Sequence, residues 1–172
     1  MGRQGDVDFL GWVSTSRDGL RKTAYLLCGD WFLADDLVQD ALTRLFGVWG
    51  DVSGRGNPGP YARKTLVNLY LDHRRRPSRR EVPLVELPDG GGVEQSRPVD
   101  GERERLMAGL RQVPNGQRAV LVLRYWEDMS VEQTARIIGT SASNVRSQAS
   151  RGLDALRAAL EPDSVTTPKD TP

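Results

Sequence analysis

The side chains best suited to chemistry in this sequence are hydrogen-bonding groups gathered between residues 143 and 151. At helical spacing they share one face of a predicted helix, opposite an apolar face. They are Ser143, Asn144, Arg146, Ser147, Gln148 and Arg151. Asn and Gln amides can pair with adenine, and an Arg guanidinium can pair with guanine or phosphate. Because no carboxylate interrupts this face, it favours DNA reading over the alternative, a solvated polar face on two packed helices.

Two predicted helices and a tight turn would position this polar face. Ser130 and Gln133 have the spacing of a capping box, which opens a short helix over 131–138. Gly139 allows the left-handed turn that re-aims the chain, and the hydroxyl residues after it cap a longer helix that ends near residue 160. The pattern predicts a helix-turn-helix, whose second helix can lie in a DNA major groove.

A strongly basic strip lies in the first half of the chain. Residues 61–80 carry seven Lys or Arg against one Asp, a net charge of +6, although the whole chain carries only +1. Most of the strip falls on a predicted helix over about 61–75. Clustered cations of this kind contact DNA phosphates, so the strip indicates a nucleic-acid partner. The alternative is a solvated helix end that complements the helix dipole.

An acidic helix precedes the basic strip. Between Asp30 and Asp51 there are five acidic residues and one Arg, and Asp30 suits the N-cap of a helix over about 31–48. The functional interpretation is a docking face for a basic protein. The alternative is ordinary placement of acids near a helix N-terminus, where the dipole stabilises them.

Helical periodicity dominates the chain, and no strand alternation is convincing. We therefore predict an all-α fold of two small helical domains at 1–80 and 102–160, the second a helix-turn-helix. A flexible linker at 81–101 with a net charge of −4 joins them, and a disordered tail follows at 161–172. The Gly- and Pro-rich segment 51–60 predicts a loop without helix.

Three packing expectations follow from the apolar residues. Trp49 and Tyr61 flank the predicted loop and could stack on bases, but core packing is the expectation for Trp49. Leu106 and Leu110 would form the buried stripe of the first helix of the second domain. The next helix of that domain would be a single helix over 117–125.

Composition excludes several classes of function. The single Cys28 and single His73 rule out a disulfide framework and clustered Cys or His metal sites. No nucleophile–base pair is suggested, so we expect neither an enzyme nor a cofactor. The chain has no apolar run long enough to span a membrane and no secretory signal at its start, so we expect a cytoplasmic protein.

Three stretches together resemble a known family. Residues 34–40 (ADDLVQD) resemble the core-binding helix of bacterial sigma-70 factors. Residues 60–68 with 72–76 resemble the promoter −10 region of the small extracytoplasmic-function (ECF) group, and residues 118–125 with 129–156 resemble its −35 module. The 29–31 and 61–68 stretches look most like the actinobacterial SigE-type subfamily. Both modules stand in the family's order with a linker between them, which makes the resemblance specific.

The resemblance implies a role for each group of residues. The loop at 51–60 would hold a flipped base, and the polar face at 143–151 would read the −35 element. Residues expected to bind core RNA polymerase are Asp35, Asp36, Leu37, Gln39 and Asp40. Residues expected to bind −10 DNA are Asn57, Tyr61, Arg63, Lys64, Asn68, Arg74, Arg75 and Arg76.

The implied partners are the β′ clamp helices and β flap of core RNA polymerase, promoter DNA, and an anti-sigma factor if one exists. The protein would act at the nucleoid. Ser143 and Asn144 stand where the family commonly has Gly-Thr, and Gln148 stands where it commonly has a basic residue, so the resemblance implies no particular promoter sequence. Two rival hypotheses are a helix-turn-helix regulator that binds an operator without polymerase, and a helical protein that binds only another protein.

Overall fold

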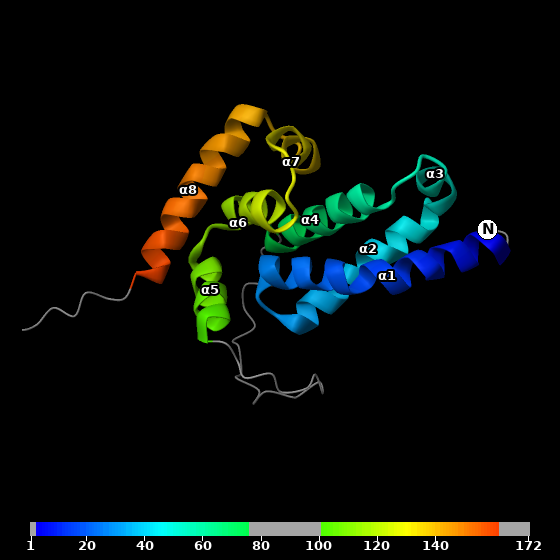
Figure 1. Cartoon of the computed structure of the whole chain (residues 1–172), viewed down its shortest axis with the longest axis horizontal. Helices are drawn as coiled ribbons and strands as arrows, with labels where there is room; N and C mark the ends of the chain where they lie inside the picture. The colour runs from blue at the N-terminus through cyan, green and yellow to red at the C-terminus, as the bar shows by residue number, and fades with distance from the viewer. Residues whose placement is uncertain (1–2, 76–100, 162–172) are drawn as a thin grey trace, which may run out of the picture.

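The computed structural model of the chain describes residues 3–75 and 101–161. Every regular element in these two ranges is a helix, and neither range contains a strand, so the all-α prediction is confirmed there (Figure 1). We call residues 3–75 the N-terminal module and residues 101–161 the C-terminal module. The predicted linker, apart from Gly101, and the predicted tail, apart from Glu161, lie outside the described residues.

Four helices form the N-terminal module. They are α1 (Arg3–Cys28), α2 (Trp31–Gly47), α3 (Trp49–Ser53) and α4 (Gly59–Arg75). Gly29 ends α1 with a positive φ of 74°, which a residue without Cβ adopts at no steric cost. Asp30 then caps α2 as predicted, and its carboxylate accepts hydrogen bonds from the amides of Phe32 and Leu33.

Aromatic rings close the far end of this module. Trp49 is 4% exposed, and its ring meets the ring of Phe9 edge-on with 5.1 Å between centroids. Phe9 also meets Phe46 edge-on at 5.0 Å. These contacts confirm that Trp49 packs in the core, so it is not available to stack on a base. Tyr61 is half-buried and packs against the same core.

The prediction that residues 51–60 contain no helix was wrong. Helix α3 extends to Ser53, and α4 begins at Gly59. Proline is well suited to a first helical turn, where its missing N–H would have no intrahelical partner. Pro60 is the second residue of α4 and therefore does not prevent the helix. The non-helical segment is therefore only residues 54–58.

The C-terminal module contains α5 (Gly101–Gln112), α6 (Asn115–Leu121), the π-helical segment η2 (Val122–Trp126), α7 (Val131–Ile138) and α8 (Ala142–Leu160). The single helix predicted over 117–125 is therefore an α-helix that continues into a π-helical turn. Leu106 is 41% exposed, contrary to prediction, because Met107 and Leu110 form the buried face of α5. Leu106 and Met107 are both apolar neighbours, so the spacing of apolar residues alone does not decide which of the two side chains is buried.

The predicted helix-turn-helix is confirmed. Ser130 and Gln133 form the reciprocal capping box at the start of α7. Gly139 has a φ of 76°, in the left-handed region, and the Ser141 hydroxyl accepts a hydrogen bond from the Asn144 amide at the start of α8. Each helix end is thus fixed by its own sequence.

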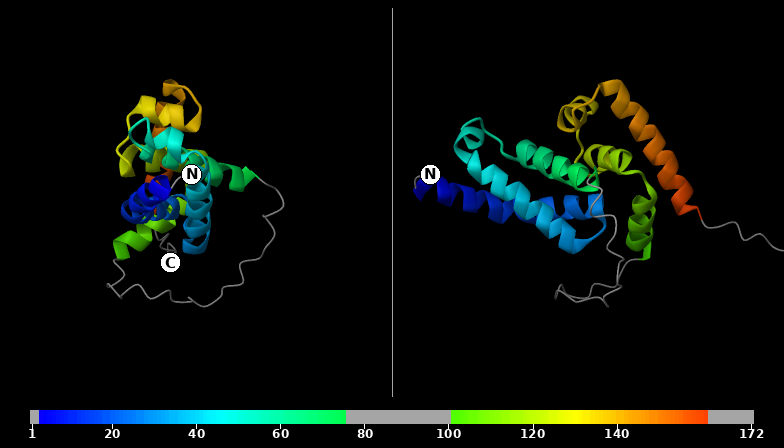
Figure 2. Two further views of the ribbon diagram at one scale, coloured as in Figure 1. Left: turned by 90° about the vertical axis from the view of Figure 1, so that its right-hand side faces the viewer. Right: turned by 180° about the vertical axis from the view of Figure 1, so that it is seen from behind.

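The two modules pack against each other and share one hydrophobic core. Helices α6 and α7 lie beside α4, and the views in Figure 2 show the same contact from the side and from behind. The core of α1, α2 and α4 continues into Val122, Leu123 and Met129 of the C-terminal module. The Tyr70 hydroxyl also bonds to Asn115 Oδ1 across this boundary, at 2.9 Å. The described residues therefore form one packed body.

Candidate nucleic-acid interface

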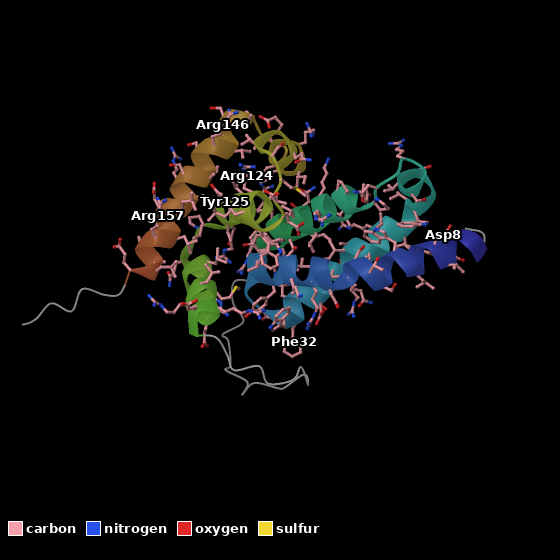
Figure 3. All side chains as sticks on the ribbon, viewed as in Figure 1. Asp8, Phe32, Arg124, Tyr125, Arg146 and Arg157 are labelled. Carbon is pink, nitrogen blue, oxygen red and sulfur yellow. The ribbon has the colours of Figure 1, made fainter. Side chains whose placement is uncertain are left out.

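The predicted DNA-reading residues of α8 lie together on one outer face. All six are on the surface, with Gln148 half-buried and the others exposed. We call these six residues the reading face. The side-chain amide of Asn144 donates from Nδ2 to Thr140 Oγ1 at 2.7 Å, which holds the Asn144 side chain over the turn. Arg146 stands near the α7 end of α8 (Figure 3). The arrangement suits a helix whose N-terminal half enters a groove.

The opposite side of α8 is fixed in the protein. Val145 is fully buried and packs with Val120 and Ala135. Gly152 lies so close to Leu121 that an added Cβ would stand 3.1 Å from Leu121 Cγ. Both contacts hold α8 close to α6, so the reading face rests on a rigid support.

Glu132 lies beside the reading face, and the sequence did not single it out. Its carboxylate lies 3.6 Å from Arg146 across the α7–α8 turn, and both side chains are exposed. The pKa of Glu132 lies below its usual value. The largest cause is a hydrogen bond from its own backbone amide, and a hydrogen bond from the Ser130 side chain and the positive charge of Arg146 add to it. The carboxylate therefore lies opposite the Arg146 guanidinium at the start of α8. The spacing of 14 residues between them carries no recognisable signal.

The basic residues of α4 divide into two groups. The first group, Lys64, Arg74 and Arg75, is exposed. The Arg74 guanidinium lies 5.9 Å from the centre of the Tyr70 ring, and Arg75 Nη1 lies 4.0 Å from Asp72 Oδ1. Arg63 is only 34% exposed, because its Nε donates to the carboxylate of Glu127 in the C-terminal module. Asn68 is half-buried on the same helix, and Arg76 lies outside the described residues.

The short loop before α4 places two further predicted residues. Asn57 is exposed, and its Oδ1 accepts the amide of Gly59 at 2.9 Å, so it acts as a cap for the start of α4. Tyr61 follows one turn later with part of its ring exposed.

The acidic face of α2 presents three of its five predicted residues to solvent. Asp36, Gln39 and Asp40 are exposed, whereas Leu37 is 4% exposed and belongs to the core. Leu37 therefore shapes the helix from within and cannot touch a partner in this arrangement. Asp35 is half-buried and is held by an ion pair with Arg21, whose Nε lies 2.7 Å from Oδ1.

A stack of aromatic rings fixes that ion pair. The Arg21 guanidinium lies 4.4 Å from the centre of the Trp31 ring, and Trp31 stacks in parallel on Tyr25 at 3.9 Å. Beside this stack an apolar groove runs between α1 and α2, lined by Leu10, Leu42 and Phe46 among others. Asp35 and Gln39 of α2 also line this groove, so polar groups border an apolar surface, as they do in protein interfaces.

Metal binding and membrane insertion have no support among the described residues. They contain no group of three or more Cys, His, Asp or Glu side chains able to hold a metal. None of their helices is long and apolar enough to cross a membrane. Cys28 is buried, and burial raises the pKa of its thiol, so it is a neutral packing residue.

Comparison with known families shows the family to which the chain belongs. The family model described as "Sigma-70 region 2" matches residues 12–80 of the chain. The family model described as "Sigma-70, region 4" matches residues 103–156. The chain belongs to the sigma-70 family. The acidic face of α2 and the basic helix α4 fall in region 2, and the reading face of α8 falls in region 4.

Relatives of this sigma-70 chain confirm the resemblance to the ECF group and the SigE type. An "RNA polymerase sigma-E factor" of Streptomyces avermitilis is 37% identical over 155 residues, covering 90% of this chain and 86% of the relative. A Streptomyces antibioticus protein of the same name is 38% identical over 159 residues, covering 92% and 88%. "ECF RNA polymerase sigma factor EcfG" of Rhodopseudomonas palustris is 32% identical over 160 residues, covering 88% and 86%.

Solved structures have the same fold as this sigma-70 chain. The sigma factor RpoE of Bartonella quintana, solved with the anti-sigma factor NepR, superposes with a TM-score of 0.70 at 24% identity and covers 91% of this chain and 98% of that one. CnrH, solved with the cytosolic domain of CnrY, has a TM-score of 0.65 at 22% identity, covering 91% and 89%. The predicted fold, two helical modules of which the second is a helix-turn-helix, is therefore the fold of these solved structures.

Proposed function

We propose that this sigma-70 family member binds core RNA polymerase and directs it to promoters with a −10 and a −35 element. The observation that carries the proposal is the presence, in one chain, of a basic region 2 helix and a region 4 reading face on a rigid support. A helix-turn-helix regulator that acts without polymerase would have no use for the first of these. The family membership of both modules favours the sigma factor over that rival.

The reading face of α8 is the proposed −35 contact. Gln148 and Asn144 can pair with adenine through their amides, and Arg146 or Arg151 can pair with guanine or with phosphate. The hydrogen bond from Asn144 to Thr140 and the ion pair from Arg146 to Glu132 hold two of these side chains near the start of the helix. A preordered side chain loses less entropy when it binds.

Helix α4 and the loop before it are the proposed −10 contact. Lys64, Arg74 and Arg75 are exposed and can approach phosphates. Removing a base from the stack costs a few kcal/mol, which a fitted pocket and phosphate contacts can offset. Asn57 and Tyr61 border the loop where such a base would lie. Melting by this route requires no catalytic residue, so the proposed role is not enzymatic.

The acidic face of α2 is the proposed contact with the β′ clamp helices. Asp36, Gln39 and Asp40 would meet the polymerase directly, and the groove beside them would receive apolar side chains. The C-terminal module would contact the β flap. Because structural neighbours were solved with anti-sigma factors, we also propose that a protein inhibitor can bind this chain. These partners place the protein in the cytoplasm, at the nucleoid.

The test is transcription with purified core RNA polymerase. The full chain is mixed with core enzyme, and promoter-dependent transcripts are mapped on a library of genomic fragments. We expect a complex with core and transcripts that start downstream of an asymmetric two-part site. A stable dimer that binds a palindrome and ignores core polymerase would overturn the proposal. An Asp36→Lys, Asp40→Lys variant should lose core binding and serves as the negative control.

A further inference from the structure

The groove between α1 and α2 has an acidic end. The two helices run antiparallel, side by side in Figure 1 and in Figure 2. Phe9 meets Phe46 at one end of the groove. Arg21 pairs with Asp35 at the other end. The groove has a volume of about 490 Å³, and Asp6, one helical turn before Phe9, belongs to its lining. A carboxylate therefore stands at one end of a mostly apolar groove.

One oxygen of the Asp6 carboxylate has no donor. Oδ1 is buried, yet it accepts no hydrogen bond within the described part of the chain. A buried carboxylate oxygen without a donor raises the free energy of the folded state, because burial removes its hydrogen bonds to water. Asp35, the other acid that lines the groove, already receives hydrogen bonds from Arg21. Asp6 Oδ1 is therefore open to a donor that comes from outside the described residues.

Exposed apolar side chains line the groove beside Asp6. Leu10 is 64% exposed and Phe46 is 42% exposed, and Leu42 is half-buried in the wall that α2 provides. Apolar side chains that are exposed together commonly mark a surface that a partner covers. A long basic side chain suits both parts of this groove, because its methylene groups can pack on apolar walls while its charged head reaches a carboxylate.

We propose that the groove receives a basic side chain, lysine or arginine, from a helix of core RNA polymerase, and that Asp6 is its counter-ion. The inference rests on the proposed function and adds Asp6 and Leu10 to the polymerase contact. Both residues precede residue 12, where the match to region 2 begins. The groove also continues the proposed contact, because Gln39 belongs to both. A charge-assisted hydrogen bond at Asp6 would fix the position of the partner helix along α1.

Arg17 gives the partner helix a direction. It lines the groove eleven residues after Asp6, which is about 16 Å along α1 at 1.5 Å per residue. Eleven residues are close to three whole turns, so the two side chains lie on the same face of the helix. Arg17 repels a cation at its own end of the groove. The basic side chain of the partner therefore enters at the Asp6 end.

The test compares Asp6→Asn with Asp8→Asn in the full chain. Both variants remove one negative charge from the first two turns of α1, but Asp8 is exposed and lies outside the lining of the groove (Figure 3). Leu10→Ala is compared in the same way with Val7→Ala. The parent side chains are 64% and 63% exposed, and of these two only Leu10 lines the groove. The affinity of each labelled chain for purified core RNA polymerase is measured by fluorescence anisotropy.

We expect Asp6→Asn to weaken core binding by about tenfold or more, the effect of losing one charge-assisted hydrogen bond at a partly buried site. Leu10→Ala should weaken it several-fold, and the two control variants should bind as the parent does. Urea denaturation of the free chain reports a structural role. Asp6→Asn should lower the midpoint no more than Asp8→Asn, because Oδ1 has no hydrogen bond to lose.

A second measurement needs no polymerase. The probe is n-propylguanidinium, which has the head group and stem of an arginine side chain, and its neutral counterpart is n-propylurea. The methyl resonances of Leu10 and Leu42 are followed in the full chain while each compound is added. We expect n-propylguanidinium to shift both resonances saturably in the millimolar range. Asp6→Asn should abolish this saturation, and n-propylurea should not produce it.

Three results would overturn the inference. The first is an equal loss of core affinity in Asp6→Asn and Asp8→Asn, and the second is the same methyl shifts with both compounds. The third is a loss of core affinity in Asp6→Asn that accompanies a loss of stability larger than that of Asp8→Asn. A parent chain that failed to bind core polymerase would refute the proposed function, and the probe titration would then decide separately whether the groove binds a cation.

Discussion

The guanidinium of Arg118, on α6, donates a hydrogen bond to the carbonyl oxygen of Leu27 at the end of α1, with 2.8 Å between Nη1 and O. Its Nη2 donates to the carbonyls of Arg111 and Val113, at 2.8 and 2.9 Å. Arg118 is 4% exposed, and burial lowers the pKa of its guanidinium. One side chain therefore closes the α5–α6 turn and also joins it to the N-terminal module.

Replacing Arg118 should destabilise the protein strongly. Arg118→Ala would leave three carbonyl oxygens without this donor, and we expect a loss of about 2–5 kcal/mol in the free energy of unfolding. Urea denaturation followed by circular dichroism measures it. Arg111→Ala is the matched control, because its bond to the Gly29 carbonyl at 3.1 Å is exposed and should contribute less than about 1 kcal/mol. Equal losses in the two variants would contradict the assignment.

Alkaline pH should reveal the burial of Cys28. Burial raises the pKa of the folded thiol above its ordinary value of about 9, so the unfolded chain loses this proton first as pH rises. The stabilising effect is therefore complete below pH 9 and is lost as pH rises toward the folded pKa. We expect the unfolding free energy of the parent to fall above pH 9.

Cys28→Ser is the control for this titration. The serine hydroxyl can keep the hydrogen bond that Cys28 donates to the Asp30 carbonyl, at 3.1 Å, but it does not ionise in this range. Its stability should fall less steeply between pH 9 and 10. Tyr70, whose pKa is also raised by burial, titrates higher and is common to both proteins. Identical slopes for parent and variant would show that the thiol does not contribute.

Arg74 and Arg75 at the end of α4, together with Arg76, which follows them in the sequence, should act on every DNA sequence alike. Replacing Arg74, Arg75 and Arg76 with Ala removes sequence-independent interactions with phosphates, so affinity should fall on all duplexes. The salt slope should flatten by about 0.9 for each phosphate that is no longer neutralised. Anisotropy titrations at several salt concentrations measure both effects. A selective loss on one promoter would contradict a phosphate role.

Gln148→Ala should instead change which promoters are used. Its amide lies half-buried in the reading face, where it can pair with one base edge. We expect a discrimination loss of about 1–3 kcal/mol at one −35 position and little change elsewhere. Transcription from a library of randomised −35 elements measures it, with Ser150→Ala as the neighbouring control. Uniform weakening across the library would exclude base reading by Gln148.

Gly139→Ala should destabilise the turn that aims α8. A residue with a Cβ in the left-handed region costs about 1–2 kcal/mol, and Gly139 has a φ of 76°. DNA binding should weaken together with stability, because the reading face would shift. Gly116→Ala is a suitable control, since Gly116 is a helical residue with open space at its Cβ position and should become slightly more stable. Equal stability changes at the two positions would contradict the prediction.

Features set by nearby residues can be predicted from the sequence, and features set by distant residues cannot. The Asp30 cap, the Ser130–Gln133 capping box and the Gly139 turn each depend on residues within four positions, and all three are confirmed. The contact of Arg63 with Glu127 joins positions 64 residues apart. Nothing in either local pattern distinguishes that arginine from Lys64 beside it. The core that the two modules share likewise depends on how helices pack.

The errors also have a physical cause. The Gly and Pro residues at 51–60 predict a loop without helix. In the structure α3 ends just before Gly54, and Pro60 lies in the first turn of α4, where a proline is tolerated. Leu106 is predicted in the core because it shares a spacing of four with Leu110. In the structure the inward-facing side of α5 instead carries Met107, the next residue along the chain, together with Leu110.

The support beneath α8 has an evolutionary consequence. The residues that hold the helix, Val145 and Gly152, lie on the opposite side from the reading face, whose side chains contribute little to folding. Mutations at Ser143 or Asn144 should therefore be almost neutral for stability while they change the DNA sequence that is bound. Promoter preference in this lineage can drift without an intermediate that fails to fold, and the departure from the family's common Gly-Thr at these two positions is the kind of change that such freedom permits.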